Sequence, residues 1–261
     1  MESVTSPPSR RDQQRADTIA QIKAVARDQL TTAGPAAISL RAIARTMGMS
    51  APALYRYFPG LDALVTALCA DLYDELRRFM VARCDTLPET DMIGRLLTAA
   101  RGFRLWAVRH RPEFTLMFAS LVPGAVIAGP GCHSRDLDPE QEPYASMRRF
   151  SQVFGDMFHK VFHQSDAERG FTLRTPQPPP MTPGLREEIQ RCATAIGADV
   201  PIEFGYAFHS FWIRLYGLVA MEVFGQLPVV QEAEALLDAE LHDMAGQLGL
   251  NLTEFTASRA D

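Results

Sequence analysis

The sequence predicts an all-α protein in which an N-terminal helix-turn-helix domain precedes a larger helical domain. Apolar residues recur every three or four positions along most of the 261-residue chain, which is the period of a helix with one buried face. No segment shows the apolar/polar alternation of a β-strand. Residues 39–58 contain the signals of two short helices separated by a glycine. The hydrophobic fraction of 47% is sufficient for a large core.

Charge is unevenly distributed along the chain. Residues 1–60 contain eight Arg or Lys and four acidic residues, a net charge of +4, whereas the whole chain carries −5 and the remainder therefore −9. A basic end on an acidic body predicts local rather than general affinity for a polyanion. The four cysteines form no CxxC pair, and no apolar run reaches membrane-spanning length. We therefore expect a cytoplasmic protein without a disulfide framework, membrane contact, metal or cofactor.

The first elements are expected to be a disordered arm over residues 1–14 and a helix over Ala16–Ala33. The arm is polar and contains a proline pair. The helix has apolar residues at helical spacing and ends at Gly34, which is followed by Pro35.

Residues 39–58, with the sequence SLRAIARTMGMSAPALYRYF, predict a helix-turn-helix. Ser39 precedes the first helix and can cap it. The apolar face of that helix is formed by Leu40, Ile43, Ala44 and Met47. Gly48 allows the positive φ of a turn, and Ser50 supplies a second N-cap. The second helix is too short to be stable by itself, so it must be held by packing of Leu54 and Phe58.

The outer side of this segment is expected to contact DNA. The candidate DNA-binding residues are Arg41, Ser50, Ala51, Pro52, Tyr55, Arg56 and Tyr57. A small Ala-Pro surface beside tyrosines and arginines suits close approach to phosphates and base edges. A hairpin that only served a helical core would gain little from exposing these side chains. We therefore favour DNA binding over a purely structural hairpin, with residues 50–58 in the major groove.

The stretch from Arg15 to Leu68 resembles the N-terminal domain of the TetR family of bacterial transcriptional regulators. The resemblance is carried by SLRAIARTMGMS, by PALYRYFP and by the start of a fourth helix, LDALVTAL. It implies a homodimeric repressor that binds a palindromic operator and senses a small molecule in its C-terminal domain. Many family members place a phosphate-binding lysine where the fourth helix begins, and this chain has Pro59-Gly60-Leu61-Asp62 instead. The phosphate contact is then either weaker or supplied by arginines 10, 11 and 15.

The domains are expected to be a DNA-binding domain at 15–60 and a ligand-binding and dimerisation domain at 61–255. Residues 122–143 are rich in Gly and Pro and predict a functional flap or disorder, and residues 170–183 predict a stiff extended linker. The expected helices of the larger domain are Leu61–Arg83, Asp91–His110, Pro112–Ala119, Tyr144–His163, Gly184–Ile196, Pro201–Phe224 and Val230–Leu248.

The last two helices are expected, from the family, to form a four-helix bundle with a second copy. The candidate dimerisation residues are Phe208, Trp212, Leu215, Leu237 and Leu241. This region also resembles a subgroup with a Trp-His-Gly motif, whose positions are here Trp212, Tyr216 and Gly217. A core helix of a monomer is the alternative interpretation.

A ligand pocket is expected in the larger domain, for a small apolar or aromatic compound. Its candidate residues are Phe103, Trp106, His110, Met117, Phe118, Phe154, Met157 and Phe158. The alternative is that these are ordinary core residues. His159 and His163 have the i, i+4 spacing of metal ligands, but without a nearby acidic or cysteine partner no metal site is predicted.

Two other functional classes remain as alternatives. Arg104, Trp106, His110 and Arg111 could bind an anion in the cavity of a helical enzyme, or the hairpin could bind a protein. The sequence contains no nucleophile motif or phosphate-binding loop, so we predict a transcriptional regulator and not an enzyme.

Overall fold

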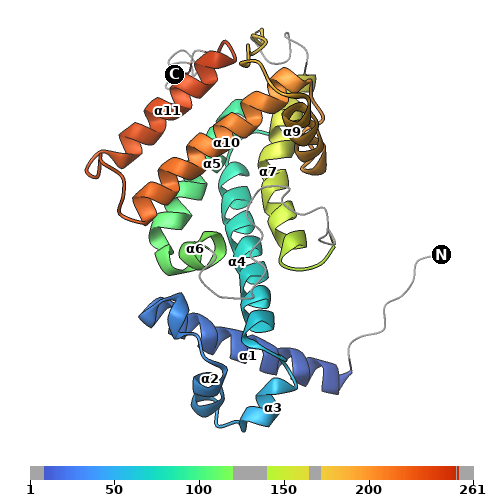
Figure 1. Ribbon diagram of the computed structural model, residues 1–261, viewed down its shortest axis with the longest axis vertical. Coiled ribbons are helices and arrows are strands. Elements are labelled where there is room, and N and C mark those ends of the chain that lie inside the picture. The colour runs from blue at the N-terminus through green and yellow to red at the C-terminus, as the bar shows by residue number, and fades with distance from the viewer. Residues whose placement is uncertain (1–8, 120–139, 165–171, 251, 253–261) are drawn as a thin grey trace, which may run out of the picture.

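The computed structural model describes residues 9–119, 140–164, 172–250 and 252. These ranges contain helices and no strand, which confirms the predicted all-α class. None of the helices in them combines the length and apolar character that crossing a membrane requires. A small head, formed by α1 to α3, lies at one end of the molecule, and the remaining helices form a larger body (Figure 1).

The head consists of three helices and one turn of 3₁₀-helix. Their bounds are α1 (Arg10–Ala33), η1 (Pro35–Ala37), α2 (Leu40–Thr46) and α3 (Ala51–Tyr55). The first helix begins at Arg10, earlier than the predicted Ala16, because Ser9 caps it: the Ser9 Oγ accepts a hydrogen bond from the Asp12 amide at 3.2 Å. The part of the predicted arm at residues 1–8 lies outside the described residues.

The helices of the body begin and end within three residues of the predicted bounds. They are α4 (Leu61–Cys84), α5 (Met92–Arg109), α6 (Arg111–Phe118), α7 (Tyr144–His163), α9 (Pro183–Ala195), α10 (Ile202–Val223) and α11 (Ala233–Gln247). Most of the segment 122–143 falls outside the described ranges. Residues 172–182 are non-helical, as predicted for a linker, and the Arg174 amide donates to the Leu248 carbonyl at 2.9 Å.

The core is continuous from the head to the body. Figure 1 shows α4 running from its start beside the head into the middle of the body. Ile22, Leu30 and Leu54 are fully buried in the head, and rings from three helices meet in the body. The centroid of Phe103 lies 5.9 Å from that of Phe150 and 5.5 Å from that of Trp212. Because α4 packs against helices of both the head and the body, it connects the two parts.

Candidate nucleic-acid interface

The helix-turn-helix is built by the local signals that its sequence contains. The Ser39 and Ser50 hydroxyls accept hydrogen bonds from the amides of Ala42 and Ala53, at 3.5 Å and 3.4 Å. Both serines therefore serve as N-caps. Gly48 adopts a φ of +65° in the turn, a conformation that glycine takes at little steric cost. These contacts set the direction in which α3 leaves α2.

The second helix of the motif is shorter than predicted. It spans Ala51–Tyr55, about one and a half turns, and Arg56 and Tyr57 lie in the turn that follows. Leu54 is fully buried and Phe58 is 6% exposed. The packing of these two side chains therefore fixes a helix that its own propensity could not maintain.

The candidate DNA-binding residues lie together on the outer side of the head. Five of them are exposed, namely Arg41, Ser50, Pro52, Tyr55 and Arg56. Ala51 and Tyr57 are half-buried. The Arg15 guanidinium lies 5.2 Å from the centroid of the Tyr57 ring, and its Nη2 donates to the Arg56 carbonyl at 3.5 Å. Arg15 of α1 therefore supports the turn that follows α3, through the Tyr57 ring and the Arg56 carbonyl.

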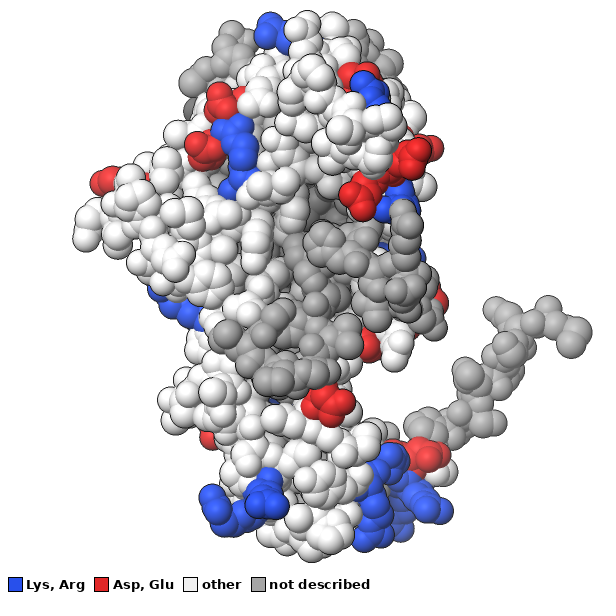
Figure 2. Space-filling model, in the orientation of Figure 1, with Lys and Arg blue, Asp and Glu red and all other residues white. Residues whose placement is uncertain are grey.

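Exposed arginines of the head have no carboxylate partner. Figure 2 shows Lys and Arg gathered in two groups at the free end of the head. Within the described part of the chain, no acidic side chain lies within salt-bridge distance of the exposed residues Arg10, Arg11, Arg15, Arg41, Arg45 and Arg56. Several arginines of the body do have such a partner, for example Arg104 with Glu222 and Arg214 with Asp243. The positive charge of the head is therefore available to phosphates.

The sequence prediction did not include Arg45. Its position four residues after Arg41 on α2 places both side chains on one side of that helix, and this spacing could have identified it. Arg10, Arg11 and Arg15, which were expected as possible substitutes for the missing lysine, lie in the first turns of α1 and are exposed.

Comparison with known proteins decides the family. Residues 22–68 match the family model described as "Bacterial regulatory proteins, tetR family". Residues 96–244, more than half of the chain, match "Tetracyclin repressor-like, C-terminal domain". This chain belongs to the TetR family. Members of that family are DNA-binding transcriptional regulators, which sets this TetR-family protein among transcription factors and not among enzymes.

Curated relatives include the HTH-type transcriptional regulators Rv1816 of Mycobacterium tuberculosis (strain ATCC 25618 / H37Rv) and Mb1846 of Mycobacterium bovis (strain ATCC BAA-935 / AF2122/97). Each is 40% identical over 106 residues, which cover 40% of this chain and 45% of the relative. The match thus spans less than half the length of these relatives.

Two solved structures resemble the whole TetR-family chain. A crystal structure described as the regulatory protein SCO4313 is 27% identical, covers 92% of this chain and 100% of its own, and has a TM-score of 0.65. A protein of unknown function from Rhodococcus sp. RHA1 is 16% identical, with coverage of 93% and 98% and a TM-score of 0.54. The second likeness shows the fold alone.

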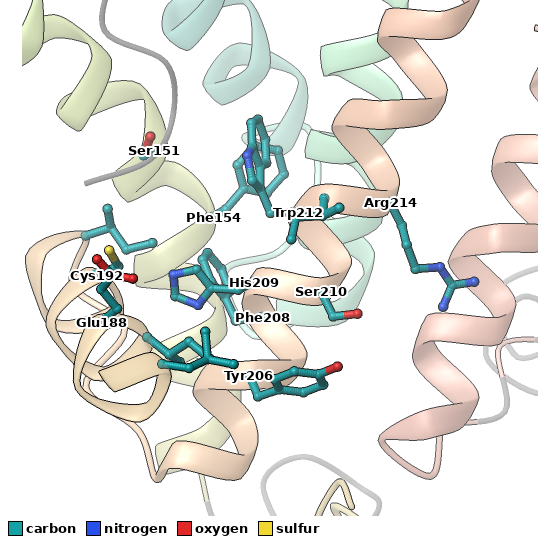
Figure 3. Close-up of a pocket in the computed structure, with 14 residues that line it drawn as sticks. Ser151, Phe154, Glu188, Cys192, Tyr206, Phe208, His209, Ser210, Trp212 and Arg214 are labelled. Carbon is teal, nitrogen blue, oxygen red and sulfur yellow. The ribbon is translucent and has the colours of Figure 1, made fainter. Parts of the chain in front are cut away.

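Among the described residues of the body, two cavities of the TetR-family protein share one wall, and a wider, more open groove lies beside α7. The larger, about 380 Å³, lies between α7, α9 and α10 (Figure 3). The smaller, about 90 Å³, lies between α5, α7, α10 and α11. Phe154, Phe208 and Trp212 line both cavities, and the side chains of His209 and Glu188 line the larger one. The sequence prediction missed His209 and Glu188, because neither belongs to an apolar stripe.

The candidate ligand residues are divided between the cavities and the core. Phe154 lines both cavities, Phe158 the smaller, and Met157 an open groove beside α7. Phe103, Trp106 and Met117 are buried in the core. The His110 ring lies against Trp106, and Phe118 packs against Phe103. Their role as ligand contacts stays a prediction.

The candidate dimerisation residues are mostly covered by their own protomer. Phe208, Leu215, Leu237 and Leu241 are at most 8% exposed, and Trp212 faces the cavities. A buried side chain has little surface to offer a second copy.

The outer faces of α10 and α11 are formed by other residues. Ile213, which also lies at the edge of the larger cavity, is 67% exposed, and Met221 is 41% exposed. A Cβ added at Gly217, between them, would meet no atom within 4 Å. On α11, the small residues Ala235 and Ala239 are exposed. We call this surface the outer face of α10 and α11.

The subgroup motif at Trp212, Tyr216 and Gly217 stays a prediction. In the structure the rings of Trp212 and Tyr216 stack, with centroids 6.0 Å apart.

A charged junction connects the head to the body. Arg27 of α1 donates two hydrogen bonds to Glu75 of α4 and two to Glu113 of α6, and the Trp106 indole N–H also reaches Glu75, at 3.3 Å. Glu113 is only 3% exposed. Hydrogen bonding to Glu75 raises the pKa of Arg27. Burial alone would raise the pKa of Glu75, but Arg27 and Trp106 bring it below its ordinary value.

The cations of the anion site considered above are already occupied. Arg104 forms two hydrogen bonds of 2.7 Å with Glu222, and the Arg111 Nη1 donates to the Val223 carbonyl at 3.1 Å. Both arginines thus fix the end of α10. His159 stacks on His163, and no group of three metal-ligating side chains occurs among the residues described.

Proposed function

We propose that this protein is a homodimeric, ligand-responsive repressor that binds a palindromic operator through residues 39–58 of each protomer. The observation that carries the proposal is the set of exposed head arginines without carboxylate partners around the open side of α3. Such unpaired cations supply the phosphate contacts that hold a short helix in register on a duplex.

The proposed DNA contact combines α3 with the arginines beside it. Ser50, Pro52 and Tyr55 would approach the base edges of the major groove, because their side is exposed and contains no bulky buried group. Arg41 and Arg56 would contact phosphate or guanine. A helix of five residues reads only a half-site, so that specific binding requires two copies about 34 Å apart.

The proposed dimer uses the outer face of α10 and α11. Exposed Ile213 and Met221 would be buried against the second copy, while Gly217, Ala235 and Ala239 would let the helices approach closely. A two-fold axis through this face makes the same patch meet itself, as closed dimers require. The proposed dimer would thus place two copies of α3 on the two halves of a palindromic operator.

The proposed regulation divides the chain into a DNA-binding domain at 15–60 and a sensing and dimerising domain at 61–255, acting in the cytoplasm. A small apolar or aromatic ligand in the body would move α4 and, through the Arg27 junction, the head. The ligand can change DNA affinity only by as much as its own affinity differs between the two arrangements.

The test is operator binding by variants of the head. On DNA from upstream of the protein's own gene, Arg41→Ala and Tyr55→Ala should each weaken binding by about tenfold, the size of one lost base or phosphate contact. Arg186→Ala, which removes an exposed arginine of α9, should leave affinity unchanged.

Salt separates DNA binding from a protein-binding hairpin. The affinity for DNA should fall steeply as salt rises, since counterions are released on binding. Head variants that bind like Arg186→Ala, or an absence of DNA binding at low salt, would contradict the proposal.

A further inference from the structure

The larger cavity presents aromatic faces along its inner wall. Phe154 and Trp212 lie with their ring centroids 5.8 Å apart, and Phe208 completes the partition toward the smaller cavity. Aromatic rings favour an apolar ligand body and also attract a cation through their negative faces. The wall alone therefore admits either a neutral or a cationic ligand and disfavours an anionic one.

Two of the polar groups that line this cavity, Glu188 and His209, can accept a hydrogen bond from a ligand, beside the hydroxyls of Ser151, Tyr206 and Ser210, which can donate or accept. Figure 3 shows His209 extending from α10 toward Glu188 and Cys192 of α9. The His209 Nδ1 lies 2.8 Å from the Gly205 carbonyl oxygen. Because a carbonyl can only accept, Nδ1 carries the hydrogen of this contact, and in that tautomer Nε2 presents a lone pair. The Glu188 carboxylate also only accepts, so a ligand that contacts both Glu188 and His209 must donate to them.

The charges around the larger cavity are unfavourable to an anion. Among the described residues that line it, the cation is Arg214. Its guanidinium is bound to Glu240 and Asp243 of α11, and in Figure 3 it extends away from His209. Glu188 has Arg191 at 3.4 Å, but both side chains are exposed, and such surface pairs are weak. The carboxylate of Glu188 therefore remains available to a ligand.

We propose that the larger cavity is the effector site and that it binds a small hydrophobic cation: an amine with an aromatic or alkyl body. The ammonium lies between Glu188 and His209, and the body lies against Phe154 and Trp212. This inference rests on the ligand-responsive function proposed above and adds to it the position of the site and the chemical class of the effector. The smaller, apolar cavity lies behind the shared wall.

The test compares three probes with the same carbon skeleton: 4-phenylbutylamine, 4-phenylbutan-1-ol and 4-phenylbutanoate. Binding to the full-length protein is measured by titration calorimetry and by quenching of tryptophan fluorescence, since Trp212 lines the cavity and Trp106 is buried elsewhere. The amine should bind about fivefold more tightly than the alcohol, the effect of one ion pair with an exposed carboxylate, and the carboxylate most weakly. The amine should also release the protein from DNA.

Two glutamates of α9 provide the matched variants. Glu188→Gln should lower the affinity for the amine about fivefold and leave that for the alcohol unchanged. Glu187→Gln, at an exposed position that does not line the cavity, should change neither.

Several results would overturn the inference: preferential binding of the carboxylate, equal effects of the two variants, absence of binding by all three probes at millimolar concentration, or amine binding that leaves DNA affinity unaltered. Each can occur with DNA binding intact, in which case the DNA-binding part of the proposed function stands. Loss of that part would instead be seen as failure of the unliganded protein to bind DNA.

Discussion

Replacing Arg27 with Met would remove the only guanidinium that contacts both α4 and α6 among the residues described. The variant keeps most of the apolar side chain of α1 but withdraws the hydrogen bonds to Glu75 and Glu113. Glu113, which is 3% exposed, then keeps only the His110 Nδ1, at 3.7 Å, as a neighbouring ring nitrogen. The loss of stability therefore arises at the contact between the head and the body.

The magnitude follows from burial. Removing one partner of a fully buried ion pair costs about 3–5 kcal/mol. The side chains of Arg27 and Glu75 are 33% and 31% exposed, so that water can solvate part of the vacated site. We therefore expect Arg27→Met to lower the free energy of unfolding by about 2–3 kcal/mol. Most of that loss arises from Glu113, because its carboxylate has no other access to water.

Urea denaturation at fixed protein concentration measures this loss, since the proposed dimer would make apparent stability depend on concentration. The double variant Arg27→Met/Glu113→Gln should recover about 1 kcal/mol or more, because a neutral amide is cheaper to bury unpaired than a carboxylate. Arg101→Met, which breaks an exposed pair with Asp238, should cost less than about 1 kcal/mol. An Arg27→Met variant as stable as Arg101→Met, or no recovery in the double variant, would refute the reasoning.

Three further predictions concern acid, the support of α3 and the dimer. Arg27 lowers the pKa of Glu75, so the pair contributes stability above the unfolded pKa of about 4.3 and loses it as the pH falls further. The difference in unfolding free energy between the parent and Arg27→Met should therefore shrink in urea titrations below about pH 4.3. A constant difference would contradict this. Arg15→Met removes the contacts with the Tyr57 ring and the Arg56 carbonyl, so DNA affinity by fluorescence anisotropy should fall about three- to tenfold with little loss of stability; unchanged affinity would show that α3 needs no support from α1. Ile213→Asp puts a charge on the outer face and should yield monomers by analytical ultracentrifugation, whereas an unchanged dimer mass would exclude this face.

The fold was predictable where the decisive interactions are local. Ser39 and Ser50 specify N-caps and Gly48 specifies a turn, each through contacts with residues close by in the sequence. The structure has the caps and the turn at those positions. A local signal also limits how far α3 can extend: Phe58 precedes Pro59, and a residue before proline is disfavoured in helical conformation.

The sites were less predictable because periodicity identifies a buried face but not the partner that buries it. Phe208 and Leu215 have the spacing of a dimer seam, yet they pack inside their own protomer. Trp212 lies beside them and faces two cavities. The Arg27 junction joins Arg27 to Glu75 and Glu113, which lie 48 and 86 positions further along the sequence. No pattern within one helix reveals such a contact.

Footprinting of the dimer on an operator selected from random duplexes tests the central claim most directly. The account predicts two symmetric protected tracts in successive major grooves, about 34 Å apart, both of which disappear with Tyr55→Ala and both of which weaken as salt rises. A single protected tract, or a pattern that Tyr55→Ala leaves intact, would contradict it.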